Sequence, residues 1–453
     1  MAFIQAYDIM SHENIKAWAE EKIAADSYAV RFMLHAAAEL LERPWFRRCW
    51  VVQEFVLCKE REPYFQCGQY LVSSKAFPQF SLDAHFSSPK LLQLYTKGAA
   101  YYDPRILAGP CAQGLVMWSA HSRFETRSKT STMDWLLLYN DLEATNARDK
   151  LYSSLGLQKW GGERETPEEN VVSNGLIIDY DASVEDVYSS AVRHQVKSTH
   201  KLDILLSCGP RSDLVTRSWV PDWTVSSISE AHKVLEFDYK PETSKKTQCI
   251  VKFANDLSFM VVRGFVWDTI RLVENHWPSQ IGDSPYYTAR QEFCRAAWSY
   301  EEFGEWHKSD QKAADTLWRA MLHPYYLADE TPEKSTALIA SLLAPRSTWQ
   351  KDLRSLLDKG KRFGGVCFQT LRGQVGNAFR GNKEFQPYLA EDARVQIGDL
   401  VCVLLGCPVP MVLRKQKSHY EVVVPVFEEG VMRGEAMDRI DDGSITLQDF
   451  ELH

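Results

Sequence analysis

The sequence predicts a mixed α/β (α+β) protein, and three observations lead to this prediction. Strand and helix patterns alternate in the first half of the chain, β-forming segments gather near the C-terminus, and the Trp-, Ala- and Leu-rich stretch 285–360 has helical spacing. The 453 residues are 45% hydrophobic and 25% charged, the composition of a globular protein that buries a core. This length favours two or three structural units over one.

Charge and targeting signals narrow the class of protein. Lys and Arg number 52 against 60 Asp and Glu, a net charge of -8 without blocks of like charge, so we expect neither nucleic acid nor a membrane as partner. The N-terminus lacks a basic segment followed by an apolar one, and the most apolar stretch, 400–413, is too short to span a bilayer. We therefore expect a cytoplasmic protein whose ten cysteines are reduced.

The first elements are expected to be helices. Residues 10–42 have amphipathic helical spacing, and Pro44 is suited to the first turn of the next helix. We expect that helix to run through "RPWFRRCWVVQEFVLC" (43–58). A strand is expected in "PYFQCGQYLV" (63–72), where Gly68 indicates a tight turn or a bulge.

A short helix is predicted in "ATNARDKLYSSLGL" (144–157). Thr145 or Asn146 is suited to cap its start, and Gly156 is suited to end it. Asp149 lies in the first turn, where the helix dipole favours a carboxylate.

The segment "GLIIDYDASVEDVYSSAVRHQV" (175–196) predicts a strand, a turn and a helix. Ile177 and Ile178 are β-forming residues, and Ser183 with Asp186 resembles a capping box. The helix that follows has one apolar face, which we expect to pack against a core.

Strand patterns dominate two later regions. "CIVKF" (249–253) and "SFMVVRGFVWDTI" (258–270) flank "ANDL", which is typical of a hairpin loop. Near the C-terminus, "GDLVCVLLG", "PMVLRK" and "YEVVVPVF" predict a strand-rich meander. Between these regions the helical spacing of 285–360 predicts an inserted helical lobe.

Two charged residues on the predicted helix 43–58 are candidate catalytic residues. On a helical wheel Arg47 and Glu54 fall within about 20° of each other, with Trp50 between them, and most surrounding positions are apolar. Both side chains are therefore expected to be partly buried, where each needs a partner, a backbone group or a ligand. The alternative is that both tie the helix to neighbouring loops.

The segment "SWVPDW" (218–223) contains candidate binding residues. Aromatic walls around a carboxylate suit a cation or another ligand, so Trp219 and Asp222 are candidates. The alternative is a packed loop corner in which Asp222 caps backbone amides. Asp149 is a third candidate catalytic residue, with a helix-start charge as its alternative.

Motifs of common nucleotide, metal and hydrolase sites are missing. The sequence contains no GxGxxG, no GxxxxGK(S/T), no HExxH and no GxSxG at a strand-to-helix elbow. Its twelve histidines show no paired ligand spacing. We therefore predict no metal and no cofactor.

Five blocks in a fixed order resemble a known family. They are "RPWFRRCWVVQE", the "CG" of Cys67 and Gly68, "ATNARDKLYSSLGL", "DYDASVEDVY" and "SWVPDW". With them the chain resembles fungal heterokaryon-incompatibility (HET) domain proteins. Downstream, "VRGFVWDTI", "GDLVCVLLGCPVPMVLR" and "VFEEGVMRGEAM" are similar to the region that accompanies the domain in many such proteins.

The resemblance implies a fungal intracellular protein of heterokaryon incompatibility, non-self recognition and programmed cell death, with protein partners in incompatibility signalling. HET domains are thought to be distantly similar to TIR domains, some of which cleave NAD with a glutamate after a "WC..E" signature. By that analogy Trp50 and Glu54 match this signature, with Glu54 facing the ribose of a nucleotide-like ligand and Arg47 an anionic group. The alternative is an enzyme on a repurposed HET-like scaffold, either NAD-cleaving or acting in secondary metabolism.

The start of the chain departs from the family pattern. HET domains begin with strands and an "ID.LCI.Q"-like segment before the tryptophan helix, and the residues present there lack it. We therefore expect a truncated N-terminal part of the domain. The expected regions are a partial TIR-like HET core at 1–160, an α+β region at 161–275, a helical insertion and linker at 276–392 and a β-rich module at 393–453.

Overall fold

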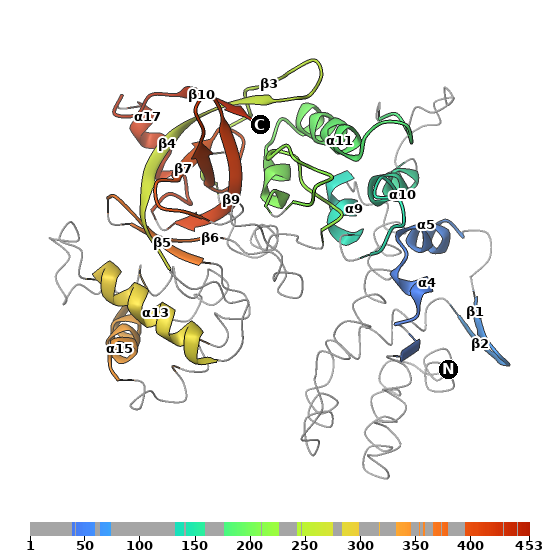
Figure 1. Ribbon diagram of the computed structural model, residues 1–453, viewed down its shortest axis with the longest axis horizontal. Coiled ribbons are helices and arrows are strands. Elements are labelled where there is room, and N and C mark those ends of the chain that lie inside the picture. The colour runs from blue at the N-terminus through green and yellow to red at the C-terminus, as the bar shows by residue number, and fades with distance from the viewer. Residues whose placement is uncertain are drawn as a thin grey trace, which may run out of the picture. The chain divides into compact units, whose positions relative to one another are not determined.

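The computed structural model of the protein divides into two compact units, Met1–Ile178 and Asp179–His453. Helices and antiparallel sheets are both present, which confirms the mixed α/β prediction (Figure 1). Most of the expected helix 10–42 lies outside the described residues. The structure describes residues 39–40, 42–58, 64–73, 132–139, 142–158, 176–209, 211–225, 242–245, 247–274, 283–298, 317, 332–345, 353, 357, 366–372, 374–378, 395–428, 430–441 and 443–453.

The first unit contains short helices and one β-hairpin among its described residues. Helices α5 and α9 both contact α10, and the hairpin turns at Gly68, whose φ of 60° is left-handed. The tight turn predicted there is confirmed. The elements are α4 (Pro44–Arg47), α5 (Cys49–Leu57), β1 (Tyr64–Cys67), β2 (Tyr70–Ser73), α9 (Thr132–Tyr139) and α10 (Asp149–Gln158).

Helix α10 begins as predicted but does not end at its glycine. The Asn146 side chain accepts a hydrogen bond from the Arg148 amide at 3.1 Å, which identifies Asn146 as the capping side chain. Gly156 lies inside the helix, which continues to Gln158. A Cβ at Gly156 would lie 1.8 Å from Nε2 of Gln53 on α5. The glycine therefore allows the two helices to approach closely.

The second unit begins with helix α11 (Val184–Thr199) and the 3-10 helix η3 (Asp203–Ser207). The predicted capping box is confirmed, because Ser183 Oγ accepts a hydrogen bond from the Asp186 amide at 3.0 Å. The strand predicted at Ile177 and Ile178 is wrong. Both side chains are exposed and no named strand includes them; Ile177 forms only an isolated β-bridge, so β-propensity did not produce a strand here.

One eight-stranded sheet lies at the centre of this unit's described strands, and its longest strand is β4, which curves along it in Figure 1. The first part of β4 pairs with both β3 and β10, the middle part with β7 and the last part with β5. Since β7 also continues through β8, β9, β6 and β5 back to β4, six strands close a ring. The strands are β3 (Val251–Phe253), β4 (Met260–Val273), β5 (Val366–Thr370), β6 (Val375–Ala378), β7 (Leu400–Leu404), β8 (Met411–Lys415), β9 (Tyr420–Glu428) and β10 (Gln448–Leu452).

These strands follow the sequence patterns. The β3–β4 hairpin around residues 254–257 and the β7–β8–β9 meander are both confirmed. Phe265 and Trp267 of β4 lie in one core cluster with apolar side chains of β7, β8 and β9. Strands β4, β5 and β7 come from three of the four expected regions, and they share this one sheet.

Helices α13 (Asp283–Trp298) and α15 (Pro332–Leu343) supply a second core cluster. Phe293 of α13 and Leu342 of α15 are buried there together with Val375 of β6. Arg290 of α13 and Glu274 form a buried ion pair at 3.0 Å, which ties the helix to the end of β4. A short helix, α17 (Asp438–Asp441), follows the 3-10 helix η9 (Glu435–Met437).

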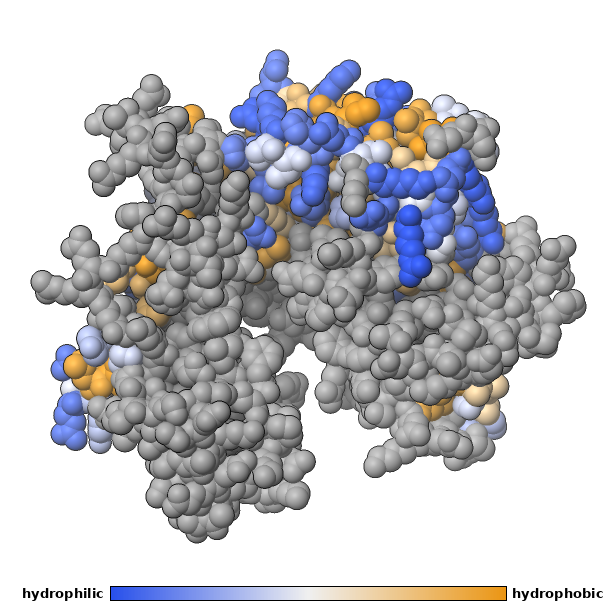
Figure 2. Space-filling model, turned by 180° about the vertical axis from the view of Figure 1, so that it is seen from behind, coloured by the Kyte–Doolittle hydropathy of each residue, from blue (hydrophilic) through white to orange (hydrophobic). Residues whose placement is uncertain are grey.

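Polar and apolar side chains are interspersed on the face of the molecule that Figure 2 shows. Figure 2 shows small hydrophobic areas between hydrophilic side chains on one face. Among the described residues, no helix combines the length and the hydrophobicity needed to cross a lipid bilayer.

We predict that Gly264→Ala destabilises the sheet by about 1–3 kcal/mol. A Cβ at Gly264 would lie 2.3 Å from the carbonyl oxygen of Val403 on β7, a backbone atom of the paired strand. Gly209→Ala is the matched control, since a Cβ there meets no atom within 4 Å. Urea denaturation measures the difference, and equal stabilities of the two variants would contradict the packing described for β4.

Candidate functional site

The expected continuous helix 43–58 is interrupted at Arg48. This residue has an extended backbone, with φ of -78° and ψ of 130°, and separates α4 from α5. The Glu143 amide donates to the Arg47 carbonyl at 2.5 Å, and the Cys49 amide donates to the Glu143 carbonyl at 3.0 Å. Glu143 thus satisfies the backbone groups that the break leaves without helical partners. The helical wheel that placed Arg47 and Glu54 on one face does not apply across this break.

Arg47 and Glu54 are both exposed, so the expectation that they are partly buried is wrong. Arg47 pairs with the Glu143 side chain at 3.4 Å, with 46% and 62% of the two side chains exposed. Glu54 makes no hydrogen bond or ion pair within the described part of the chain. An exposed ion pair of this kind contributes little to stability. Arg47 therefore follows the alternative expectation, in which it ties its helix to a neighbouring loop.

Asp149 and Trp50 lie next to the buried thiol of Cys49. Asp149 opens α10, and its carbonyl accepts a weak hydrogen bond from Cys49 Sγ at 3.7 Å. Trp50 is half-buried on α5. Burial raises the pKa of Cys49, with hydrogen bonding to Ser153 opposing this, so the thiol stays protonated at neutral pH and is a poor nucleophile. The catalytic roles of Glu54, Arg47 and Asp149 stay predictions.

Trp219 and Asp222 are both buried in the loop 211–225. The Asp222 carboxylate accepts hydrogen bonds from the amide and hydroxyl of Ser212, at 2.7 and 2.5 Å, and from those of Thr224, at 2.9 and 2.6 Å. The Trp219 ring lies 5.8 Å from the ring of Phe253. These contacts are those of the packed loop corner named as the alternative, and ligand binding by Trp219 and Asp222 stays a prediction.

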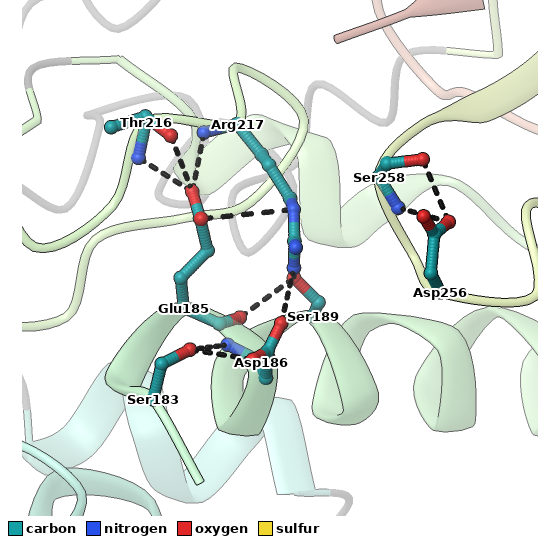
Figure 3. A network of polar contacts seen from close by, with 8 residues as sticks. All are labelled: Ser183, Glu185, Asp186, Ser189, Thr216, Arg217, Asp256 and Ser258. Atoms are coloured by element: carbon teal, nitrogen blue, oxygen red, sulfur yellow. Dashed lines mark hydrogen bonds and ion pairs between the residues drawn. The ribbon is translucent and has the colours of Figure 1, made fainter.

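A network of polar contacts holds this loop to the start of α11 (Figure 3). Glu185 accepts hydrogen bonds from the Thr216 amide at 2.6 Å and the Arg217 amide at 2.7 Å. The Arg217 guanidinium donates to Asp186 at 2.9 Å and to Ser189 at 2.8 Å. Hydrogen bonding, first from Ser183 and then from Arg217, lowers the pKa of Asp186. The Asp186 carboxylate therefore stays ionised at neutral pH, and the network fixes the loop that carries Trp219.

Sequence reasoning missed a buried polar cluster in the sheet. Trp267 Nε1 of β4 donates to Glu428 Oε1 of β9 at 2.9 Å and to Gln374 Oε1 at 3.0 Å. Glu428 Oε2 is buried without a partner among the described residues. Trp267 and Glu428 are 161 positions apart. The signal in the sequence that could have indicated this site is Glu428, a polar residue directly after the apolar run "VVVPVF".

Burial raises the pKa of Glu428 to about 8. The Trp267 hydrogen bond and the charge of Arg372 oppose this shift, while the negative charge of Asp268 adds to it. At neutral pH Glu428 is therefore a neutral carboxylic acid. The described residues include no group of three or more His, Cys, Asp or Glu side chains that could hold a metal ion.

Comparison with known proteins supports a HET-like relationship. The chain is 24% identical over 215 residues to the "heterokaryon incompatibility protein 6, OR allele" of Neurospora crassa. The match covers 44% of this chain and 31% of that protein, so the chain spans about a third of the length of its relative. No family model matches the chain, and no solved structure matches it.

We predict that the free energy of unfolding falls as pH rises, because the folded chain keeps the proton of Glu428. Between the ordinary pKa of a glutamate and about 8, the unfolded chain loses this proton while the folded chain keeps it. The free energy of unfolding then falls by up to about 1.4 kcal/mol per pH unit, and the fall ends above the folded pKa. Glu428→Gln removes this contribution.

Urea denaturation of both proteins between pH 5 and 9 isolates the contribution, since all other titrating groups are shared. The expected difference curve declines toward pH 8 and is flat beyond it. A difference that does not vary with pH would show that Glu428 titrates as in an unfolded chain.

Proposed function

We propose that this chain is a HET-like fungal protein of heterokaryon incompatibility, which recognises non-self and promotes programmed cell death through contact with a partner protein. The observation that carries the proposal is the similarity to the Neurospora crassa protein over 215 residues. Such a role needs an accessible recognition surface rather than a closed catalytic pocket.

The first unit offers exposed aromatic side chains for such contact. Trp45 of α4 and Tyr64 and Tyr70 of the hairpin are exposed. Phe65 anchors the hairpin to the helices, with its ring 5.4 Å from Trp45 and 5.9 Å from Phe55. Exposed aromatic residues on a fixed support are enriched at protein interfaces. The exposed charges of the neighbouring Arg47 and Glu143 would add specificity more than affinity.

The alternative is a TIR-like enzyme that cleaves NAD, and the match of Trp50 and Glu54 to the tryptophan–glutamate signature favours it. A catalytic glutamate of that kind needs an environment that orients it toward the ribose of its ligand. Glu54 instead faces solvent, and Arg47 pairs with Glu143. These observations support protein contact over nucleotide cleavage by this chain.

Fusion assays test the proposal. We predict that expressing the chain in one of two fusing fungal strains causes dye uptake, a sign of cell death, in the fused cells of incompatible pairings. Replacing Trp45 and Tyr64 by Ala should reduce dye uptake at least about fivefold, because both belong to the proposed contact surface. Ile397→Ala is the matched control, since Ile397 is exposed in the other unit. Absence of dye uptake in every pairing would contradict the proposed role.

Incubation with NAD tests the alternative of an NAD-cleaving enzyme. We expect the purified chain to release no nicotinamide above the rate of buffer, and Glu54→Gln to behave identically. Nicotinamide release that disappears in Glu54→Gln would replace the proposed mechanism by the enzymatic one.

A further inference from the structure

Two arginines converge on the indole of Trp267. The guanidinium carbon of Arg372, in the turn between β5 and β6, lies 5.4 Å from the ring centroid. That of Arg439, on α17, lies 4.9 Å from the same centroid. The two carbons are therefore no farther apart than the sum of these distances. Both arginines are exposed, whereas the ring beneath them is 3% exposed.

Neither guanidinium has an acceptor in the described part of the chain, although each keeps its cation–π contact with Trp267. The other arginines of this unit that reach carboxylates show the contrast: Arg414 pairs with Asp399 at 2.9 Å, and Arg217 with Asp186 at 2.9 Å. Two exposed cations that stack on one ring repel each other weakly through water, and an anion between them would remove this repulsion. Convergence of this kind favours a bound anion.

Among the described residues, no carboxylate forms an ion pair with either guanidinium. Asp268 accepts hydrogen bonds from the backbone amides of Thr269 at 2.7 Å and Arg372 at 3.0 Å. Asp438, next to Arg439, forms an ion pair with Lys245. Glu428 accepts a hydrogen bond from the indole N–H and is buried and protonated at neutral pH, so it adds no negative charge there.

The Trp267 indole and the backbone of Arg372 are held in place by hydrogen bonds. The Trp267 N–H group is fixed by Glu428 and Gln374, and Asp268 fixes the backbone of Arg372. The site is thereby organised before any ligand arrives, which lowers the entropy cost of binding.

We propose that Arg372 and Arg439 form a binding site for a tetrahedral oxyanion, a sulfate or phosphate group. Each guanidinium carries planar N–H donors of the kind that match two oxygens of such an anion. The site is independent of the incompatibility role, since its residues lie in the second unit and the proposed contact surface in the first.

Sulfate is the first probe, because its charge is constant between pH 6 and 9. Selective 15N labelling of tryptophan gives an indole signal for Trp267, assigned by its loss in Trp267→Phe, and we expect sulfate but not chloride to shift it. Arg372→Gln and Arg439→Gln should each weaken sulfate binding by about tenfold or more. Lys417→Gln, which removes one exposed charge elsewhere in the unit, should change it less than about twofold.

Inorganic phosphate and ribose 5-phosphate distinguish the source of the anion. Tighter binding of the ester assigns a phosphorylated small molecule, and equal binding assigns the free anion. Binding should weaken above pH 8, where Glu428 loses its proton beside Asp268 and Arg372, and Glu428→Gln should abolish that weakening. Sulfate binding no tighter than chloride, or unchanged binding in both arginine variants, would overturn the proposal.

Discussion

The structure of the second unit depends on the pairing of one strand, β4. Its 14 residues pair with four other strands, and the pairings with β7 and β5 each contain a register shift, between Val266 and Asp268 and between Ile270 and Leu272 respectively. Because β4 pairs with both β7 and β5, it closes the ring of strands and leaves few exposed edges. The apolar face of β4 then fixes the core on which the rest of the unit is built.

The same strand determines where polar groups gather. Trp267 and the following Asp268 lie at the first register shift, so one reaches the buried Glu428 and the other the turn after β5. The pair of arginines over the indole is a consequence of that geometry. In the first unit a different constraint acts, because the backbone of Glu143 interrupts a helix and turns its charges outward.

Local rules predicted the elements whose information lies within a few residues. The capping box at Ser183, the hairpin at 254–257 and the turn at Gly68 belong to this class. The break at Arg48 and the Trp267–Glu428 contact could not be predicted, since each depends on a residue about a hundred or more positions away. The helical wheel failed for the same reason: it assumes a continuous helix, and a distant backbone interrupted this one.

Native-state hydrogen exchange tests most directly whether β4 unites the sheet. The account predicts that the amides of Val262 and Phe265 exchange only by global unfolding, with the same free energy as those of Val403 on β7 and Val424 on β9. Earlier exchange of the β4 amides, while β7 and β9 remain protected, would contradict it. In that case β4 would be a strand added to an independently stable sheet rather than the one on which the sheet depends.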